Sequence, residues 1–475
     1  MLSGTKVKLY PTKEQEADFA KLFGCARKVY NLSLAHAIAE YEEKKKSVAN
    51  IKHLGYYFHN VLTKTEEFAY LNEHNTKVLK QPIRHLCTAF TNFFKSLKGK
   101  RKGKSGFPKF KSKHDKQKIT FPEDAISVKP FGGKKMDRLN LTTTIKGLKF
   151  KCSPEDHRFL IENKGNIKSI TITKSKAGTY HASILIDSPR GNQYRKAVYK
   201  TTDKTVGVDL GIKEFLVCSD TVVVENPRHL KKSTKKLKRK QRKLSKADIK
   251  NKNKRNEEFK LKNGRDIDPK VGNQVVQSNN RKKLVKQIAK DYEKVTNKRE
   301  TFLHEKSTML VKENQIICME DLNVKGMMKN RKLAKAIQDV GLGKFKTMMN
   351  YKCAWKGREL VFVDRWYPSS KTCSCCGHKK EELSLSERVF ICENCGLEID
   401  RDYNASLNIE REGLRLLSER KNKEKIGSRG PELKLEDCQQ IDGEIISPEG
   451  REYPNKGEDT RSDALINLDG FHKIQ

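Results

Sequence analysis

Two pairs of cysteines near the carboxyl end of the chain constrain its folding more than any other feature. Cys373 and Cys376 form one Cys-x-x-Cys turn, Cys392 and Cys395 form a second, and fifteen residues separate the turns. Each turn offers two sulfurs to the same ion, so the spacing predicts a tetrahedral zinc site. Four thiolate ligands leave no open coordination position, and we therefore expect one structural Zn²⁺ ion that performs no chemistry.

The alternative is that these residues are four reduced cysteines of an ordinary core. A glycine follows each Cys-x-x-Cys pair and allows the turn to close tightly, which favours zinc. Cys375 lies inside the first turn, and we do not count it among the ligands.

The charge balance indicates the partner. The chain has 100 Lys and Arg residues against 59 Asp and Glu residues, a formal net charge of +41. Such a chain repels itself unless it meets a polyanion, so nucleic acid is the expected partner. The amino terminus lacks the apolar core of a signal peptide, and no apolar run approaches the ~20 residues of a membrane helix, so we expect no membrane partner. Lone cysteines in apolar surroundings indicate a reducing compartment. For a prokaryotic chain we expect a cytoplasmic, nucleoid-associated protein.

Carboxylates lie at the ends of several apolar segments. Asp209 ends the strand-like segment KTVGVDL, Glu320 and Asp321 follow QIICM, and Asp400 and Asp402 lie in DRDYNAS at the start of a helix. Strands alternating with helices indicate a partly parallel sheet, and the order of elements is that of a ribonuclease-H-like fold. Carboxylates at such strand ends can converge on one divalent-metal site. The ordinary alternatives are that Asp209 caps a turn and that Asp400 caps the helix.

A dense basic segment lies between these acids. From Lys231 to Arg255 there are fourteen Lys or Arg residues and a single acid, Asp248. This density suits a phosphate backbone, and Arg239 is our candidate for such a contact. A merely solvated helix face is the alternative.

The same region predicts two paired helices. Apolar residues recur at every seventh position in two segments, one starting at Leu230 and one starting at Ile288, and give two matching apolar seams. We expect an antiparallel helical hairpin over about 229–313, with a polar loop at about 250–280.

The amino-terminal part predicts a β-rich domain with a helical insertion. A strand TKVKLY comes first, and Thr12 and Gln15 then have the spacing of a capping box at the start of a helix. The segments KSITITKS and TYHASILID alternate as strands do. Between these regions a basic stretch carries Lys109 and Lys111 beside Phe107 and Phe110. That pattern favours contact with a nucleic-acid backbone and with bases over a solvated linker.

Together these motifs resemble those of the TnpB family, RNA-guided nucleases of insertion-sequence transposons that are similar to compact type V CRISPR effectors. VGVDLG, MEDLNVKGM, SSKTCSxCG with CENCG, and DRDYNAS occur in the order seen in that family. KVKLYPTKEQE, FGCARKVYN and GFPKFKSK resemble its amino-terminal half. The resemblance covers about residues 5–412.

The resemblance implies a RuvC-type nuclease that cleaves target DNA next to a short adjacent motif and is associated with transposon maintenance. Its catalytic set matches Asp209, Glu320 and Asp402, which would bind two Mg²⁺ or Mn²⁺ ions. Asp402 is preferred over Asp400 because the family motif places its acid two residues before Asn404. The implied partners are a guide RNA and double-stranded and single-stranded target DNA.

The resemblance also suggests where the adjacent motif is read. Lys77, Lys80 and Gln81 lie in the amino-terminal lobe, at spacings that could share one helical face. An exposed polar helix face is the alternative.

We thus expect a multidomain α+β fold. Its parts are a β-barrel-like wedge domain at 1–10 and 99–198, a helical recognition insertion at 11–98, a RuvC-type α/β nuclease domain at 199–370 and 397–412, a four-cysteine zinc ribbon at 371–396, and a disordered acidic tail at 413–475. The alternatives are a CRISPR-like effector, or a transposase or regulator that binds nucleic acid without guided cleavage. The oligomeric state stays open.

Overall fold

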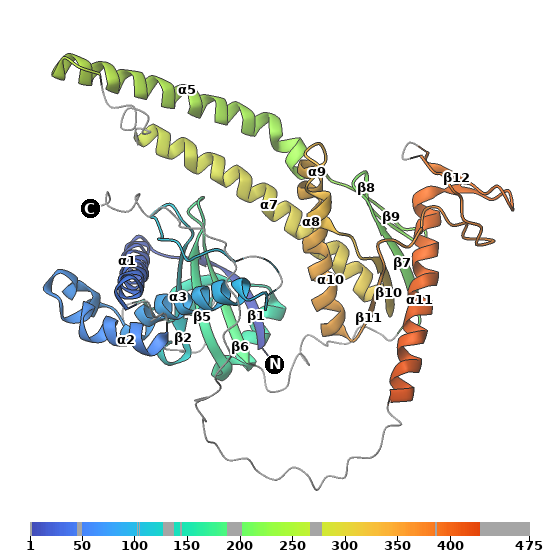
Figure 1. Ribbon diagram of the computed structural model, residues 1–475, viewed down its shortest axis with the longest axis horizontal. Coiled ribbons are helices and arrows are strands. Elements are labelled where there is room, and N and C mark those ends of the chain that lie inside the picture. The colour runs from blue at the N-terminus through green and yellow to red at the C-terminus, as the bar shows by residue number, and fades with distance from the viewer. Residues whose placement is uncertain are drawn as a thin grey trace, which may run out of the picture. The chain divides into compact units, whose positions relative to one another are not determined.

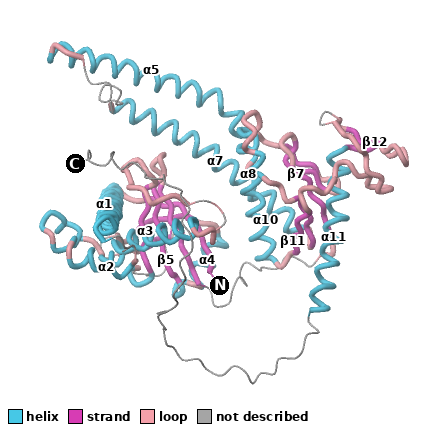
Figure 2. Tube along the Cα trace, viewed as in Figure 1, coloured by secondary structure: helices cyan, strands magenta, loops and turns pink. Residues whose placement is uncertain are grey.

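The computed structural model gives a multidomain α+β fold, as predicted (Figure 1). The described residues, coloured in Figure 2, are 2–44, 50–101, 103, 105–126, 137–142, 145–187, 202–266, 278–384 and 387–427. The domain boundary predicted near residue 198 and most of the predicted acidic tail lie outside them. In the described part of the chain, no helix is long and apolar enough to cross a membrane.

A six-stranded antiparallel sheet forms the first part, in the order β2-β5-β6-β1-β4-β3. Its strands are β1 (Leu2–Tyr10), β2 (Gln117–Pro122), β3 (Asp137–Leu139), β4 (Leu148–Lys151), β5 (Ile167–Lys174) and β6 (Tyr180–Asp187). Residues along β1 alternate between exposed and buried, because successive side chains point to opposite faces. The buried face packs Val7 and Leu9 into a core with Phe150 and Ile184.

Helices α1 (Lys13–Lys44), α2 (Ile51–Asn60) and α3 (Thr76–Leu97) form a core of their own around Val29, Leu54 and Leu86. A further short helix, α4, covers Pro154–Glu162. The predicted capping box opens α1: Thr12 N donates to Gln15 Oε1 at 3.0 Å, and Gln15 N donates to Thr12 Oγ1 at 3.3 Å.

A five-stranded sheet forms the second part, in the order β11-β10-β7-β8-β9. Its strands are β7 (Thr205–Leu210), β8 (Glu214–Cys218), β9 (Val223–Glu225), β10 (Ile316–Glu320) and β11 (Glu359–Val363). Strands β7, β10 and β11 are parallel, and β8 and β9 are antiparallel to their neighbours. Parallel strands are covered on both faces, which explains their continuous apolar sequences.

Helices cover both faces of this second sheet (Figure 1). On one face α7 (Asn279–Glu313) and α10 (Leu342–Lys356) supply Leu303, Leu310 and Phe345 to the core. On the other face α11 (Arg401–Gly427) supplies Ile409 and Leu417. The short helices α8 (Val324–Met327) and α9 (Ala334–Val340) connect β10 to α10.

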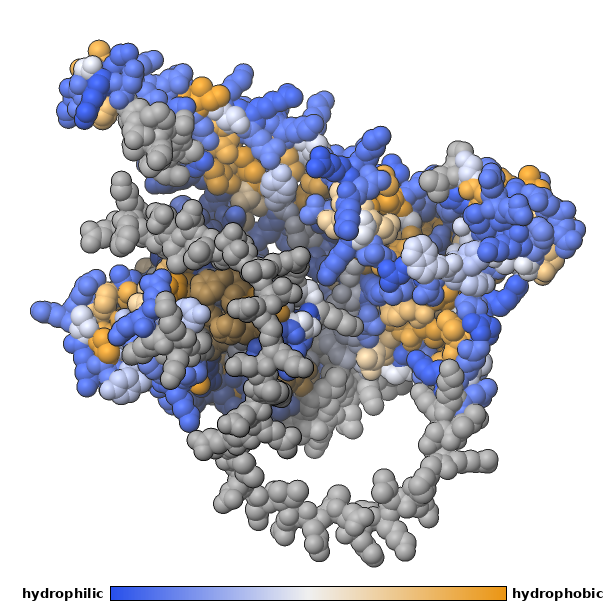
Figure 3. Space-filling model, viewed as in Figure 1, coloured by the Kyte–Doolittle hydropathy of each residue, from blue (hydrophilic) through white to orange (hydrophobic). Residues whose placement is uncertain are grey.

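The predicted helical pair is present, formed by α5 (His229–Asn263) and α7, and its seam buries Leu237, Ile288 and Val295. In Figure 3, hydrophobic residues gather along the line where the two helices meet, and hydrophilic residues cover most of the outer side of α5. The prediction of a loop at 250–280 was wrong in its first part, because α5 continues to Asn263. Lys, Arg and Glu are good helix formers that need no apolar period, and the pair Lys254–Glu258 supports the helix at 3.7 Å.

The prediction that the tail begins at residue 413 was also wrong. Helix α11 continues to Gly427, and Leu417 packs against Val361 and Val363 of β11. Ion pairs from Arg415 to Glu412 and Glu419 lie along the exposed side of this helix. The narrow apolar face that packs on β11 is enough to hold this segment as a helix.

Between β11 and α11 the chain forms a small hairpin of β12 (Val389–Ile391) and β13 (Glu398–Asp400). Strand β13 ends where α11 begins, so no linker separates the cysteine-rich segment from the last helix.

Candidate metal centres

Asp209 and Glu320 lie on one face of the second sheet, at the carboxyl ends of neighbouring parallel strands. In the register of β7 and β10, Gly207 pairs with Cys318, and Val208 pairs with Met319. Side chains two residues apart share a face, so Asp209 follows Gly207 and Glu320 follows Cys318 on the same side of the sheet. This is the side covered by α11.

Helix α11 approaches this face so closely that only glycine fits. A Cβ on Gly207 would lie 2.0 Å from the carbonyl oxygen of Ser406, and one on Gly413 would lie 2.3 Å from Cys318 Sγ. Ser406 follows the first turn of the helix, so that turn, with Asp402, lies towards the strand ends that carry Asp209. The helix thereby delivers a third carboxylate to the edge of the sheet.

The charges of the other two acids act on Asp209. Burial, and after it the charges of Asp402 and Glu320, raise the pKa of Asp209 to about 7. Burial, and then the charge of Asp321, also raise the pKa of Glu320. Bringing negative charges together in a buried place is unfavourable unless a cation joins them.

The structure separates Glu320 from the acid that follows it. Asp321 is paired with Lys346 and lies 3.6 Å from Arg365 Nη2, and the hydrogen bond from Lys346 lowers its pKa. The charge of Glu320 acts on Asp209, whereas Asp321 is paired with Lys346 and Arg365, so Glu320 is the candidate ligand of the two. No sequence pattern pointed to Lys346 and Arg365, which come from α10 and from the segment after β11.

Asp400 and Asp402 are separated in the same way. Oδ1 of Asp400 accepts the backbone N–H of Asp402 at 3.0 Å and that of Tyr403 at 2.9 Å, so Asp400 caps α11. Asp402 instead contacts two arginines, Arg401 at 3.3 Å and Arg388 at 3.7 Å. Sequence reasoning missed both arginines, which neutralise this carboxylate.

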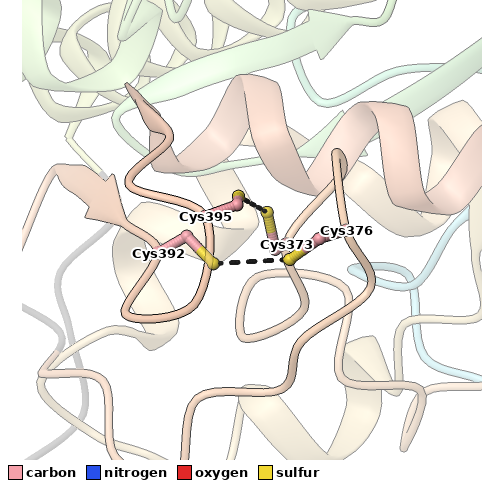
Figure 4. A group of neighbouring side chains, drawn as sticks. All are labelled: Cys373, Cys376, Cys392 and Cys395. Carbon is pink, nitrogen blue, oxygen red and sulfur yellow. Dashed lines mark hydrogen bonds between the residues drawn. The ribbon is translucent and has the colours of Figure 1, made fainter.

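The four predicted cysteines meet at one point (Figure 4). Sγ atoms of Cys373 and Cys395 are 3.6 Å apart, as are those of Cys376 and Cys392, and all four lie within 4.8 Å of one another. Tetrahedral ligands about 2.3 Å from zinc would be ~3.8 Å apart, so the set fits that ion. Cys375 is exposed and does not belong to the group.

The turns around the cysteines have the expected form. Gly377 N donates to Cys373 O, and Gly396 N donates to Cys392 O, both at 3.0 Å. The two glycines have φ of 78° and 69°, a left-handed conformation that favours glycine.

Two buried asparagines of α11 hold the cysteine-rich segment in place. Asn404 accepts from Ser374 N at 2.9 Å and donates to Thr372 O at 2.8 Å. Asn408 donates to the carbonyls of Thr372 and Ser369. Both asparagines are fully buried, so the cysteine site and the turn that carries Asp402 are directly connected.

The three carboxylates are more widely spread than the sulfurs. In the residues that the structure describes, only the four cysteines and the group His36, Glu40 and His53 bring three ligand atoms within 4.8 Å. Carboxylate oxygens are ligands that suit hard divalent cations such as Mg²⁺.

The candidate motif-reading residues have distinct surroundings. Lys77 forms an ion pair with Asp124 at 3.1 Å, and Lys80 is partly buried. Gln81 is 8% exposed and lines a cavity of about 400 Å³ between α1, α3 and the segment before β2. Five Lys or Arg residues and one acid, Asp115, contribute to its lining; the basic residues are Arg27, Lys109, Lys111, Lys116 and Lys118.

The basic segment at this cavity is held in a fixed position. Asn31 accepts from Lys111 N at 2.8 Å and donates to Lys111 O at 2.9 Å. Burial and the charge of Lys118 lower the pKa of Lys111 to about 8, and its ammonium group lies over Tyr30. Phe107 packs edge-on against two phenylalanines of α3, so it anchors the segment. Arg239, the candidate for a phosphate contact, is exposed on α5.

Three family models match parts of the chain. The OrfB_IS605 helix-turn-helix domain matches residues 1–46, the OrfB_IS605 family described as "Probable transposase" matches 191–266 and 269–331, and the Cas12f1-like TNB domain matches 343–409. "TnpB-like protein L79" of Acanthamoeba polyphaga mimivirus is 33% identical over 144 residues, 29% of this chain and 27% of that protein.

A relative from Streptomyces pristinaespiralis is 33% identical over 413 residues, covering 86% of this chain and 89% of the relative, and is named "Putative RNA-guided DNA endonuclease". The chain belongs to the TnpB family. InsQ of Escherichia coli K12, named in the same way, is 25% identical over 423 residues, 86% of this TnpB-family chain and 91% of InsQ.

Among solved structures, that of a Cas12f1–sgRNA–target DNA complex has a TM-score of 0.48 at 18% identity. It covers 84% of this chain and 83% of the other.

Proposed function

We propose that this TnpB-family protein is an RNA-guided DNA endonuclease that cleaves target DNA next to a short adjacent motif. The observation that carries the proposal is the placement of Asp209, Glu320 and Asp402 along one edge of the second sheet. We assign the second sheet with its helices to a RuvC-type nuclease domain, the first sheet to a wedge domain, and the cysteine hairpin to a zinc ribbon.

In this proposal Asp209, Glu320 and Asp402 hold Mg²⁺ or Mn²⁺. The bound ions would supply an activated water and stabilise the leaving oxygen. Asp209 and Glu320 are fixed by the sheet, whereas Asp402 is positioned by the first turn of α11. Arg401 and Arg388 now neutralise Asp402, and bound cations would take over that role and free the two guanidinium groups for phosphate contacts.

The guide RNA and the target DNA, as a duplex and as a single strand, are the proposed partners. The exposed basic side of α5 and the basic cavity beside α3 support this assignment, because phosphate contacts give affinity without sequence choice. A regulator without cleavage would need no intact set of three carboxylates. A transposase acting without RNA, or a CRISPR-like effector, would share the fold and differ in what nucleic acid it carries.

One purification separates these functions. The wild-type protein is isolated with its bound RNA and incubated with Mg²⁺ and a plasmid carrying the matching target. We expect cleavage that is lost after removal of the RNA and lost in Asp209→Ala, whose RNA content should be unchanged. Cleavage by RNA-free protein would indicate a transposase-like activity, and cleavage by Asp209→Ala at the wild-type rate would refute the catalytic assignment.

For the adjacent motif we propose Gln81 with Lys77 and Lys80. A bidentate contact to a base edge discriminates by about 1–3 kcal/mol. Gln81→Ala should therefore change the set of tolerated motifs in a depletion assay. An unchanged preference in Gln81→Ala, Lys80→Ala and Lys77→Ala would remove α3 from the reading surface.

A further inference from the structure

Two helices of the amino-terminal part bring together three metal-binding side chains that the nuclease does not use. His36 and Glu40 lie one turn apart on α1, and His53 lies in the first turn of α2. Their ligand atoms are all within 4.8 Å of one another, and all three residues are half-buried. We propose that His36, Glu40 and His53 bind one divalent transition-metal ion, with Zn²⁺ as the best match. The proposal goes beyond the nuclease function and does not depend on it.

The separation of the two imidazoles supports a shared ion. The Nε2 atoms of His36 and His53 are 3.3 Å apart. Two nitrogens bound at about 2.0–2.1 Å from zinc with tetrahedral angles are ~3.4 Å apart. The backbone thus already holds the nitrogens at the distance that one ion requires.

Neighbouring contacts hold the ligands in position. Residues at i and i+4 share a helical face, so Glu40 lies beside His36. The His36 ring is stacked on Tyr57, with centroids 3.8 Å apart and planes within 5°. At the start of α2, Asn50 Oδ1 accepts the backbone N–H of His53 at 2.8 Å and fixes the turn that carries its ring.

One adjustment accompanies binding. The two rings are within 3° of parallel, with their Nε2 atoms facing, which is the arrangement of a hydrogen bond between imidazoles. To direct both lone pairs at one ion, the His53 ring turns about its Cβ–Cγ bond, while His36 stays against Tyr57. That torsion is soft, so the turn costs little.

The ligand chemistry selects the metal. Two imidazoles and one carboxylate suit Zn²⁺ and Co²⁺, whereas Mg²⁺ prefers oxygen ligands. Three protein ligands leave a fourth position for water. A bound ion would join the carboxyl-terminal end of α1 to the first turn of α2, closing the helical hairpin.

Cobalt distinguishes this site from the cysteine site in the full-length protein. The chain is stripped with a chelator and titrated with Co²⁺ in excess Mg²⁺, which prefers oxygen ligands and keeps Co²⁺ out of the proposed carboxylate site, while its absorption spectrum is recorded. We expect two equivalents to bind: one with sulfur-to-cobalt charge transfer from the cysteines, and one with only the weak bands of nitrogen and oxygen ligands. His36→Ala should lose the second equivalent, and Glu40→Gln should weaken it at least about tenfold.

Two variants make the test specific. His53→Cys should keep the second equivalent and give it a new charge-transfer band, which a purely structural histidine could not do. His59→Ala, a change on the same helix outside the group, should leave both equivalents unchanged. Binding of one equivalent by the wild-type chain, or of two by His36→Ala with an unaltered spectrum, would overturn the proposal.

Discussion

The carboxyl group of Asp209 occupies a place that disfavours its own charge. Burial and the charges of Asp402 and Glu320 raise its pKa to about 7, well above the ordinary value of 3.8. The raised pKa lowers the free energy of unfolding of the metal-free chain, whereas a bound cation would stabilise the same charges. Function and stability therefore make opposite demands on this residue.

Asp209→Asn should abolish cleavage and stabilise the metal-free protein. Below pH 3.8 the carboxyl is protonated in both folded and unfolded chains, so the variant should gain nothing from removing the charge. The gain should grow as pH rises to about 7 and stay constant above it, at up to about 4 kcal/mol. Thermal unfolding in a chelator at pH 4 and pH 8 measures it, and equal gains at both would contradict the explanation.

Asn404 connects the proposed zinc ribbon to the turn that carries Asp402. Asn404→Ala removes the hydrogen bonds to Ser374 N and Thr372 O; the Ser374 N–H loses its acceptor, whereas Thr372 O keeps the hydrogen bond from Asn408. We expect cleavage to fall at least about tenfold, while elemental analysis still finds the ribbon zinc. Loss of the zinc together with activity would show that Asn404 supports the ribbon rather than positions the helix.

At the scale of elements, the ribbon and α11 form one continuous unit, since β13 runs into the helix. Cys392→Ala should unfold the ribbon locally, because metal binding supplies its folding energy. We expect one zinc fewer per chain and loss of cleavage. Cys375→Ala is the matched control and should keep both. A Cys392→Ala protein with undiminished zinc would show that the ligand set is different.

The contact between α11 and the sheet depends on two glycines. Gly207→Ala places a methyl group against the backbone of α11, which cannot move aside as a side chain can. We expect destabilisation of about 3 kcal/mol and loss of cleavage. Gly24→Ala in α1 meets no neighbouring element within 4 Å and should be neutral or stabilising. Equal thermal unfolding temperatures for the two variants would contradict this account.

At the scale of the whole molecule, the sequence predicted what short motifs encode. The capping box, the cysteine turns and the strand-end acids are local patterns, and the structure forms each of them. The sequence did not predict the arginines beside Asp402 or the ion pairs of Asp321 with Lys346 and Arg365. Those contacts depend on how separate elements pack together. The extent of α5 was missed because its outer part is helical without an apolar period.

The charge of the whole molecule predicts how binding responds to salt. Arg239→Ala should weaken binding to every nucleic-acid sequence equally and reduce the slope of log K against log[salt] by about 1. Gln241→Ala, two residues along α5, changes no charge and should keep the slope. Filter binding across a range of KCl concentrations measures both, and a sequence-dependent effect of Arg239→Ala would exclude a simple phosphate contact.

Helix α5 has 35 residues and, at 1.5 Å per residue, is about 52 Å long. A duplex advances about 3.4 Å per base pair, so this helix equals some ~15 base pairs in length. Helix α5 is therefore long enough to lie along about one and a half turns of a double helix. A variant with a shorter α5–α7 hairpin would keep the three carboxylates of the proposed nuclease site and would contact fewer base pairs of a bound duplex.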